Sequence, residues 1–339
     1  YRESFTDAKK TLDKYSIGIA HHKVLHLISM YKGITISELL KKLKVTKQSL
    51  NRVLRDLIKS KMIKQIQDET DTRKKNIFLD KEGKTFFEIV YNTQKKRIFN
   101  ALKNSSSDSV IKFKDVLKKI IDGMWSNYGR ILSEYVFMNN FRNSKLSDNI
   151  IIKGQEILDK IKSENKPVIF ISGHFNNFEL MAMHIEKSGL EVAAIYRPLN
   201  NKFLNFFMEK IRKKFICKHQ IKKGISGTKK ILNHFKNGTS IALMIDQRLS
   251  QGIKTNFFNQ EALTTTIPAQ FVKKFNCKIV PIYIERINKF NFALKVYEPI
   301  SYSKDETIHN ITSDLNKILE KMILKNPEQW IWSHNRWKV

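Results

Sequence analysis

One short stretch, residues 167–189, constrains the fold of this 339-residue chain more than any other. It opens with an apolar run, residues 167–172, of the kind that forms a buried strand of a parallel sheet. Gly173 and His174 follow this run. A second apolar run with helical spacing, residues 180–185, comes next, with Glu179 in the first turn of the helix and Gly189 to end it. A strand, a polar turn and a helix in this order predict an α/β sheet with His174 at the carboxyl end of a strand.

His174 and Glu179 are the first candidate catalytic pair. Imidazole exchanges a proton near neutral pH, and a nearby carboxylate can hold its ring in one tautomer. Such a pair can activate a hydroxyl, here one supplied by the substrate, for attack on an acyl group. A histidine and a glutamate five residues apart also occur by chance, and a histidine that merely caps the turn is the alternative.

The composition limits the class of partner. The chain has 62 Lys and Arg against 32 Asp and Glu, a net charge of +30, and 41% hydrophobic residues, enough for a sizeable core. The charge favours an anionic partner: nucleic acid, anionic lipid headgroups or an acidic carrier protein. A coding bias toward Lys, Asn and Ile explains it equally well. The two cysteines, Cys217 and Cys277, have no disulfide or metal-ligand spacing, so we expect a reduced, cytosolic setting and no metal or other cofactor.

Residues 34–60 are typical of two helices joined by a tight turn. Thr35 and Glu38 have the spacing of a capping box at the start of the first helix. Alternating residues at 62–66 and 75–79 then predict two strands around a charged tip. The start of the second helix, residues 46–60, presents polar and basic side chains of the types that reach base edges and phosphates: Lys47, Gln48, Ser49, Asn51 and Arg52.

With the tip sequence Asp71-Thr72-Arg73 and residues 79–83 at the start of the next helix, residues 1–122 resemble the MarR family of winged helix-turn-helix regulators. The resemblance implies that the helix at 46–60 enters the major groove of DNA and that Arg73 lies near the minor groove. It also implies a homodimer formed by terminal helices, here at 84–103 and 108–121. A winged helix used only for protein contact is the alternative.

The character of the sequence changes near Met124, and ordered motifs continue through the His174 stretch to a Trp-rich end at 327–338. Residues 123–339 resemble the late acyltransferases of lipid A biosynthesis, the lauroyl/myristoyl transferases of Gram-negative bacteria. The resemblance implies an α/β acyltransferase domain, which we expect to have a mixed central sheet flanked by helices. It implies His174 as general base, Glu179 as the residue that orients it, an acyl carrier protein thioester as donor and a hydroxyl of a lipid A precursor as acceptor.

The same resemblance adds five candidate substrate-binding residues. Arg197 meets the oxyanion, an acceptor phosphate or the pantetheine phosphate, three roles that the sequence leaves open. Asn200 falls in the same block, and Lys223 is either a phosphate ligand or a solvated lysine. Asp246 and Gln247 follow another buried strand and would lie beside the first strand end; a carboxylate that caps the next loop or pairs with a lysine is the alternative for Asp246.

Two aromatic groups also have open roles. Phe257 and Phe258 lie in a segment that resembles the family's acyl-pocket lining, although ordinary core is the favoured interpretation. Trp330, Trp332 and Trp337 form either a C-terminal packing lock or an interfacial membrane contact.

The winged helix stands where the acyltransferase family has an N-terminal membrane helix, and no apolar run is long enough to span a bilayer. We therefore expect peripheral attachment to the cytoplasmic face of the inner membrane through basic and apolar surface. The leading hypothesis is an acyltransferase fused to a DNA-binding-type winged helix. The alternative is a cytoplasmic MarR-type regulator whose C-terminal domain senses a lipid or an acyl thioester without turnover.

Overall fold

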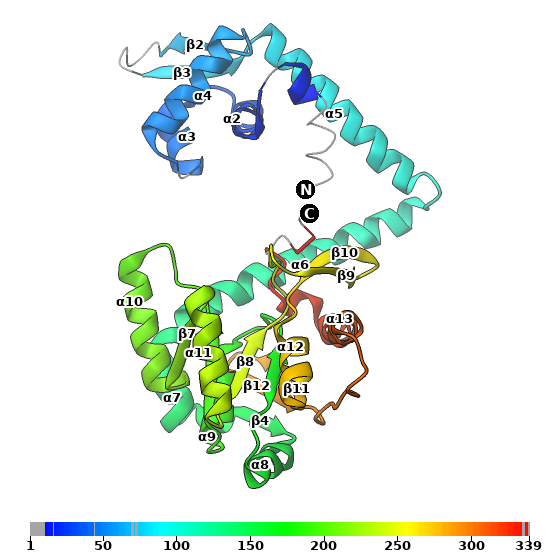
Figure 1. Cartoon of the computed structure of the whole chain (residues 1–339). Coiled ribbons are helices and arrows are strands. Elements are labelled where there is room, and N and C mark those ends of the chain that lie inside the picture. Colours follow the sequence, from blue (N-terminus) through cyan, green and yellow to red (C-terminus); the bar gives the residue numbers. More distant parts are fainter. Residues whose placement is uncertain are drawn as a thin grey trace. The chain divides into compact units, whose positions relative to one another are not determined.

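The computed structural model describes residues 11–15, 17–43, 45–68, 71, 74–333, 336 and 337. The chain divides into two compact units, Tyr1–Ile111 and Lys112–Val339 (Figure 1). This division falls inside one long helix, α6 (Ser107–Glu134), whereas the sequence placed the boundary after residue 122. The helix continues through the position where the character of the sequence changes.

The first unit is a winged helix, as predicted. Its elements are α2 (Ile19–Met30), β1 (Ile34–Thr35), α3 (Ile36–Leu43), α4 (Lys47–Lys59), β2 (Ile63–Gln67), β3 (Lys75–Leu79) and α5 (Lys81–Leu102). The strands pair antiparallel in the order β1-β3-β2. The core is formed by apolar side chains from the helices and from the sheet.

Caps fix the two helices of the helix-turn-helix. Glu38 accepts hydrogen bonds from the backbone N–H and the hydroxyl of Thr35, whose hydroxyl in turn accepts from the Glu38 N–H, so the predicted capping box is confirmed. Thr46 caps α4 by accepting from the Ser49 N–H at 3.3 Å. One face of α4 is held in the core by three buried leucines: Leu50, Leu54 and Leu57. The opposite face of α4 is left to solvent.

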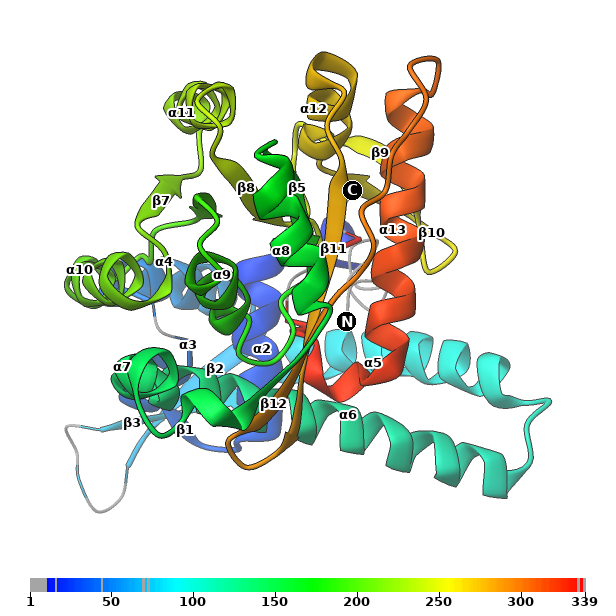
Figure 2. The same ribbon diagram turned by 90° about the horizontal axis from the view of Figure 1, so that it is seen from below.

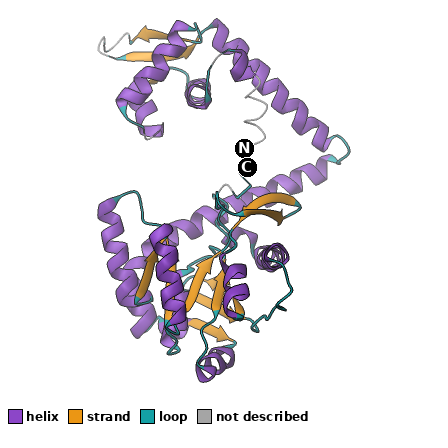
Figure 3. Ribbon diagram, viewed as in Figure 1, coloured by secondary structure: helices purple, strands orange, loops and turns teal. Residues whose placement is uncertain are grey.

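A seven-stranded mixed sheet forms the centre of the second unit (Figure 3). Its strands are β4 (Ile150–Lys153), β5 (Ile169–Ser172), β6 (Val192–Tyr196), β7 (His219–Lys222), β8 (Ser240–Met244), β11 (Ile279–Asn288) and β12 (Asn291–Val296), in the order β4-β12-β11-β5-β8-β6-β7. The five strands from β11 to β7 are parallel, and β12 and β4 run the other way. The predicted mixed sheet is confirmed.

Helices flank this sheet (Figure 2). They are α7 (Met138–Asn143), α8 (Gln155–Glu164), α9 (Glu179–Lys187), α10 (Lys202–Ile211), α11 (Ile225–Lys236), α12 (Ile267–Phe275) and α13 (Ile308–Lys325), with short helical turns η1 (Tyr135–Phe137), η2 (Ser147–Asn149), η3 (Arg212–Ile216) and η4 (Pro327–Gln329). The chain reverses direction across the sheet after β7. Right-handed crossovers therefore put α9 and α10 on one face and α11 and α12 on the other.

A separate hairpin, β9 (Ile253–Phe257) and β10 (Gln260–Thr264), packs on α13. Its two turn residues, Phe258 and Asn259, have φ angles of 51° and 57°, which is the conformation of a type I′ turn. Phe257 is fully buried, so the core interpretation of this residue is confirmed.

The C-terminal segment closes over this hairpin. Arg336 is fully buried and donates to the Leu263 carbonyl at 2.8 Å and to the Thr264 hydroxyl at 2.7 Å. Trp337 donates its indole N–H to the Phe257 carbonyl at 2.9 Å. Trp330 is buried as well, whereas Trp332 remains 37% exposed. Packing is therefore the role that the structure supports for Trp330 and Trp337.

Candidate active site

Four adjacent parallel strands carry polar residues just past their carboxyl ends. His174 follows β5, Asp246 and Gln247 follow β8, Arg197 follows β6, and Lys223 follows β7. The strands β5 and β8 pair in parallel with position 172 opposite position 244. Two residues further on, the same register brings His174 opposite Asp246. This arrangement follows the rule that reactive groups of α/β sheets gather at the carboxyl ends of the strands.

Asp246 holds the His174 ring and its backbone together. The Nδ1 atom of His174 lies 2.7 Å from Oδ1 of Asp246, and the His174 backbone N–H donates to Oδ2 at 2.7 Å. Trp330 donates its indole N–H to the same Oδ2 at 2.8 Å. The amide nitrogen of Gln247 lies 3.4 Å from Nε2 of the ring. The neutral tautomer that fits these contacts carries its proton on Nδ1 and leaves Nε2 as an acceptor.

The carboxyl group of Asp246 is charged although it is fully buried. Burial alone would raise its pKa, but the attraction and hydrogen bonds of His174, with the Trp330 hydrogen bond, outweigh burial and lower the pKa to about 2. A fixed negative charge therefore faces Nδ1 of the imidazole at neutral pH. Such a charge stabilises the imidazolium that forms when Nε2 takes up a proton.

Glu179 does not occupy the position that the sequence predicted for it. It is the first residue of α9, and its Oε1 accepts hydrogen bonds from Arg212 Nε at 2.9 Å and from the Tyr135 hydroxyl. The carboxylate on the His174 ring is that of Asp246. The orienting role predicted for Glu179 is therefore wrong in this geometry, because strand register, and not proximity in sequence, decides which carboxylate reaches the ring.

Glu179, Arg212 and Tyr135 form a buried, charge-balanced cluster. Burial strongly raises the pKa of Tyr135, and the adjacent Glu179 raises it further. Burial alone would lower the pKa of Arg212, but Glu179 and Tyr135 reverse this effect and raise it. The cluster is thus an ion pair with a protonated phenol at neutral pH.

A pocket of about 580 Å³ lies beside His174 and takes residues from the ends of all four strands. Its polar lining includes His174, Glu179, Arg197, Arg212, Gln220, Lys223 and Gln247. Its apolar lining includes Met181, Ala182, Ile185, Ile195, Leu243 and Ile282. The pocket can therefore hold a molecule with an apolar chain and an anionic group.

Two cations stand together on the rim of this pocket. Arg197 and Lys223 follow the paired strands β6 and β7, and the Lys223 backbone N–H donates to the Tyr196 carbonyl at 2.9 Å. Burial lowers the pKa of Lys223, and the positive charge of Arg197 lowers it further. An anion bound between them would relieve this repulsion. Asn200, by contrast, is exposed in the turn before α10 and does not line the pocket.

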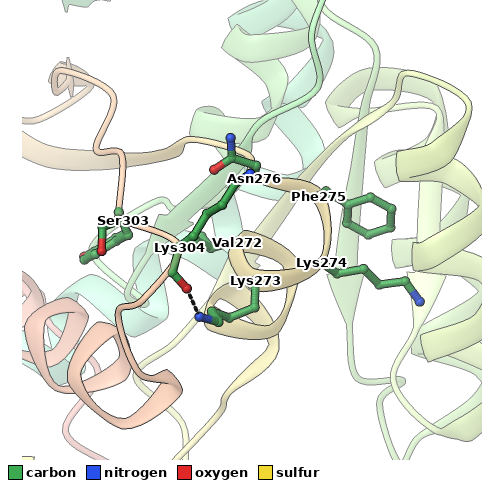
Figure 4. Close-up of a pocket in the computed structure, with 8 residues that line it drawn as sticks. Val272, Lys273, Lys274, Phe275, Asn276, Ser303 and Lys304 are labelled. Carbon is green, nitrogen blue, oxygen red and sulfur yellow. Dashed lines mark hydrogen bonds between the residues drawn. The ribbon is translucent and has the colours of Figure 1, made fainter.

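A smaller pocket, of about 370 Å³, lies at the carboxyl end of α12 (Figure 4). Lys273, Lys274 and Lys304 line it, and Lys273 donates to the Lys304 carbonyl. It shares no lining residue with the pocket of His174, and no carboxylate or imidazole side chain lines it. It therefore has no acid–base pair of the kind seen at His174.

The sequence profile of the bacterial lipid A biosynthesis acyltransferases matches residues 45–339. The chain belongs to this family. A MarR family profile matches residues 15–74, within the winged helix, and it overlaps the first match over residues 45–74.

Individual relatives fall into the same two groups. The chain is 24% identical over 231 residues to the lipid A biosynthesis palmitoleoyltransferase of Escherichia coli, covering 66% of this chain and 72% of that protein. Lipid A biosynthesis acyltransferase 2 of Shigella flexneri is 24% identical over 194 residues, 56% of this chain; the match spans 60% of the length of that relative. The HTH-type transcriptional regulator PetP of Rhodobacter capsulatus is 31% identical over 134 residues, 40% of this chain and 81% of PetP. A solved structure of the transcriptional regulator Tm0710 from Thermotoga maritima, 20% identical, covers 38% of this chain and 89% of that chain with a TM-score of 0.31.

Sequence reasoning did not assign site roles to three residues of the acyltransferase unit: Tyr135, Arg212 and Trp330. Arg212 stands among lysines at positions 210–214 and carries no distinguishing signal in the sequence. The Trp330 hydrogen bond to Asp246 joins positions far apart in the chain. Tertiary contacts bring these groups together, because all three lie on short helical turns or beside them and none on a strand of the sheet.

The polar face of α4 has the exposure that DNA contact requires. Lys47, Gln48, Ser49 and Arg52 are exposed, and Asn51 is half-buried. Arg73 lies outside the described residues.

Neither a membrane-spanning helix nor a cluster of metal ligands is present among the described residues. No described helix combines the length and the hydropathy of a transmembrane segment. No group of three or more His, Cys, Asp or Glu side chains in this part of the chain is placed to hold a metal ion.

Proposed function

We propose that the acyltransferase unit moves a fatty acyl group from an acyl carrier protein thioester to a hydroxyl of a lipid A precursor. Membership of the family supports the reaction class. The observation that carries the proposal is the His174–Asp246 pair, joined at 2.7 Å and beside a pocket with both apolar and cationic lining. This arrangement suits a hydroxyl nucleophile, an acyl chain and a phosphate.

The reaction begins with the acceptor hydroxyl bound at Nε2 of His174. As its oxygen attacks the thioester carbonyl, Nε2 accepts the hydroxyl proton, and the Asp246 carboxylate stabilises the imidazolium. The tetrahedral oxyanion then collapses, the carbon–sulfur bond breaks, and the leaving thiolate receives the proton from His174. The products are the ester and the free thiol of the carrier.

We assign the cations on the rim to the negative charges of this reaction. Arg197 lines the pocket and is our candidate donor to the oxyanion, where a fixed charge acts on the transition state. Lys223 beside it would bind a phosphate of the acceptor or of the pantetheine arm. Glu179 would act as a positioning residue, because it fixes Arg212 in the wall of the pocket.

Mass spectrometry of a lipid A precursor incubated with acyl carrier protein thioesters tests the proposal. The wild-type protein should add one acyl mass, and His174→Ala should lower the rate about 10³-fold or more, since general-base catalysis and the aligned dyad are lost together. His309→Ala, at an exposed histidine of α13, is the matched control and should react like the wild type. Equal rates for wild type and His174→Ala would refute the assignment of the base.

DNA binding is a second function, favoured by the exposed polar face of α4 and by the MarR family match. The helix would enter the major groove with Arg52 toward the bases. Apolar side chains exposed along α5 and α6, among them Ile98, Phe99, Leu117 and Ile121, would form the homodimer contacts.

A gel shift that weakens steeply with salt tests the DNA contact. DNA binding without acyl transfer, but with binding of an acyl thioester, would favour the sensing regulator over the enzyme.

A further inference from the structure

Helix α10 carries a cluster of exposed aromatic side chains. Phe203 is 74% exposed, Phe206 64% and Phe207 46%. The rings touch one another: the centroids of Phe203 and Phe207 are 4.9 Å apart, and those of Phe206 and Phe207 are 5.9 Å apart. Large apolar side chains are mostly buried in folded proteins, and a contiguous group of exposed ones marks a binding surface.

The helix is well formed although it packs little of itself into the core. Asn201 caps it by accepting from the backbone N–H groups of Phe203 and Leu204, each at 3.1 Å. Met208 is the one buried residue of α10. The helix is therefore regular, and most of its apolar side chains point outward because of their positions in the sequence.

Lysines flank these rings in the sequence. Lys202, Lys210, Lys213 and Lys214 are exposed on α10 and on the turn that follows it. The acidic residue of this segment, Glu209, is already paired with Lys222 at 3.1 Å. Phenyl rings bordered by lysines are the side chains that an interfacial helix places at the boundary between acyl chains and anionic headgroups.

Both ends of α10 are attached to the candidate active site. Arg197 lies a short turn before the helix, Arg212 follows directly after it, and both line the pocket of His174. In Figure 1, α10 lies at the outer edge of the second unit, beyond the edge strand β7. A surface that docks there would lie next to the pocket.

We propose that α10 docks the acyltransferase unit on an anionic membrane surface, so that a lipid acceptor enters the pocket of His174 directly from the bilayer. The proposal rests on the proposed function, because it takes the acceptor to be a lipid. A second copy of the chain is a poorer occupant: the exposed rings offer on the order of 400 Å², about half of the roughly 800 Å² per partner that a stable interface buries.

Vesicle flotation with the full chain tests the docking. The probes are vesicles of phosphatidylcholine with phosphatidylglycerol and vesicles of phosphatidylcholine alone. Because the whole chain is basic, some binding to anionic vesicles will come from charge alone, and the comparison between variants decides. The triple change Phe203→Ser, Phe206→Ser, Phe207→Ser should weaken binding about tenfold at raised salt, where the apolar contribution dominates.

Matched controls separate this helix from the rest of the surface. Phe290→Ser changes another exposed phenylalanine, in the turn between β11 and β12, and should leave vesicle binding unchanged. Lys213→Glu with Lys214→Glu should weaken binding, whereas Lys160→Glu with Lys321→Glu, on α8 and α13, should weaken it less. Equal binding of the wild type and the triple variant overturns the proposal. So does a wild-type dimer that the triple change converts to a monomer without loss of vesicle binding.

Turnover measured in two settings keeps this proposal distinct from the proposed function. With the lipid acceptor dispersed in detergent, the triple variant should react as fast as the wild type. With the acceptor in vesicles, it should react about tenfold more slowly. Absence of turnover by the wild type in both settings would refute the proposed function, while the flotation result would still decide the docking.

Discussion

Each buried charge beside the pocket has its own partner. Asp246 is held by His174 and Trp330, and Glu179 by Arg212 and Tyr135. Removal of one member leaves the other charge buried and uncompensated, which costs more than the intact pair contributes. Substitutions at these residues should therefore separate effects on stability from effects on chemistry.

Glu179→Gln should lower the free energy of unfolding by about 3 kcal/mol. The side chains of Glu179 and Arg212 are only 8% and 11% exposed, so that the guanidinium would lose its counter-ion where water cannot replace it. Urea denaturation of the two proteins at neutral pH measures the difference. Glu191→Gln, at an exposed glutamate paired with His219, should change stability little. Equal small losses in both variants would contradict the account of the buried pair.

The sequence indicates single site residues better than it indicates their pairing. His174, Asp246 and Arg197 each follow an apolar run, and this local signal is enough to place them at strand ends. Lys223 follows the mostly polar strand β7, which gives no such signal. Which two meet depends on sheet order, and β8 lies next to β5 although many residues separate them in the chain. Proximity in sequence favoured Glu179 for this reason, and the structure gives the contact to Asp246.

At the scale of the element, α9 is joined to α8 by a histidine that the fold keeps neutral. The ring nitrogen Nε2 of His184 lies 2.8 Å from the Gln155 side-chain carbonyl. Burial, and then the charge of Lys187, lower the pKa of His184 to about 4. In the unfolded chain the same group binds its proton at about pH 6.5. This contribution to stability is therefore complete above pH 6.5 and is lost as the pH falls from 6.5 through 4.

His184→Gln should make stability less dependent on pH. Between pH 7 and pH 5, the free energy of unfolding of the wild type should fall further than that of the variant, because the unfolded wild type takes up one more proton. Urea denaturation at both pH values measures this difference. His309→Gln, at an exposed histidine, should follow the wild type. If the His184 variant loses as much stability as the wild type, the histidine is not held neutral.

The elements were predictable where local chemistry determines them. The caps at Thr35 and Thr46 mark helix starts, and the short apolar runs mark the strands β5, β6 and β8. The helical turn η3, which carries Arg212 into the pocket, was not predictable. Tertiary contacts, and not propensity, determine that turn.

At the scale of the whole molecule, one family match covers the acyltransferase unit and another lies within the winged helix, and we expect two separable activities. A DNA duplex is first selected from a random pool by its binding to the wild-type protein. Arg52→Ala should weaken binding to this duplex about tenfold, the usual cost of one lost base contact. Acyl transfer should be unchanged, because Arg52 lies in the winged helix. Fluorescence anisotropy over a range of salt measures the affinity, with Lys160→Ala on α8 as the control. Unchanged DNA affinity in Arg52→Ala would refute the proposal that α4 contacts the bases of DNA through Arg52.

Fold class and the two families could be predicted from the sequence because ordered motifs run along both parts of the chain. The point at which the chain divides could not, because α6 continues through it with helix-forming residues on both sides and no glycine- or proline-rich linker. The motifs indicate which family a segment resembles, whereas contacts between residues determine where a compact unit ends.

The rate of acyl transfer by Asp246→Asn in a single turnover tests the central claim most directly. The substitution keeps the size of the side chain but removes the charge that fixes the His174 tautomer. We predict a rate about 10³-fold below that of the wild type, in a protein that still unfolds cooperatively. A folded Asp246→Asn protein that transfers the acyl group as fast as the wild type would contradict it.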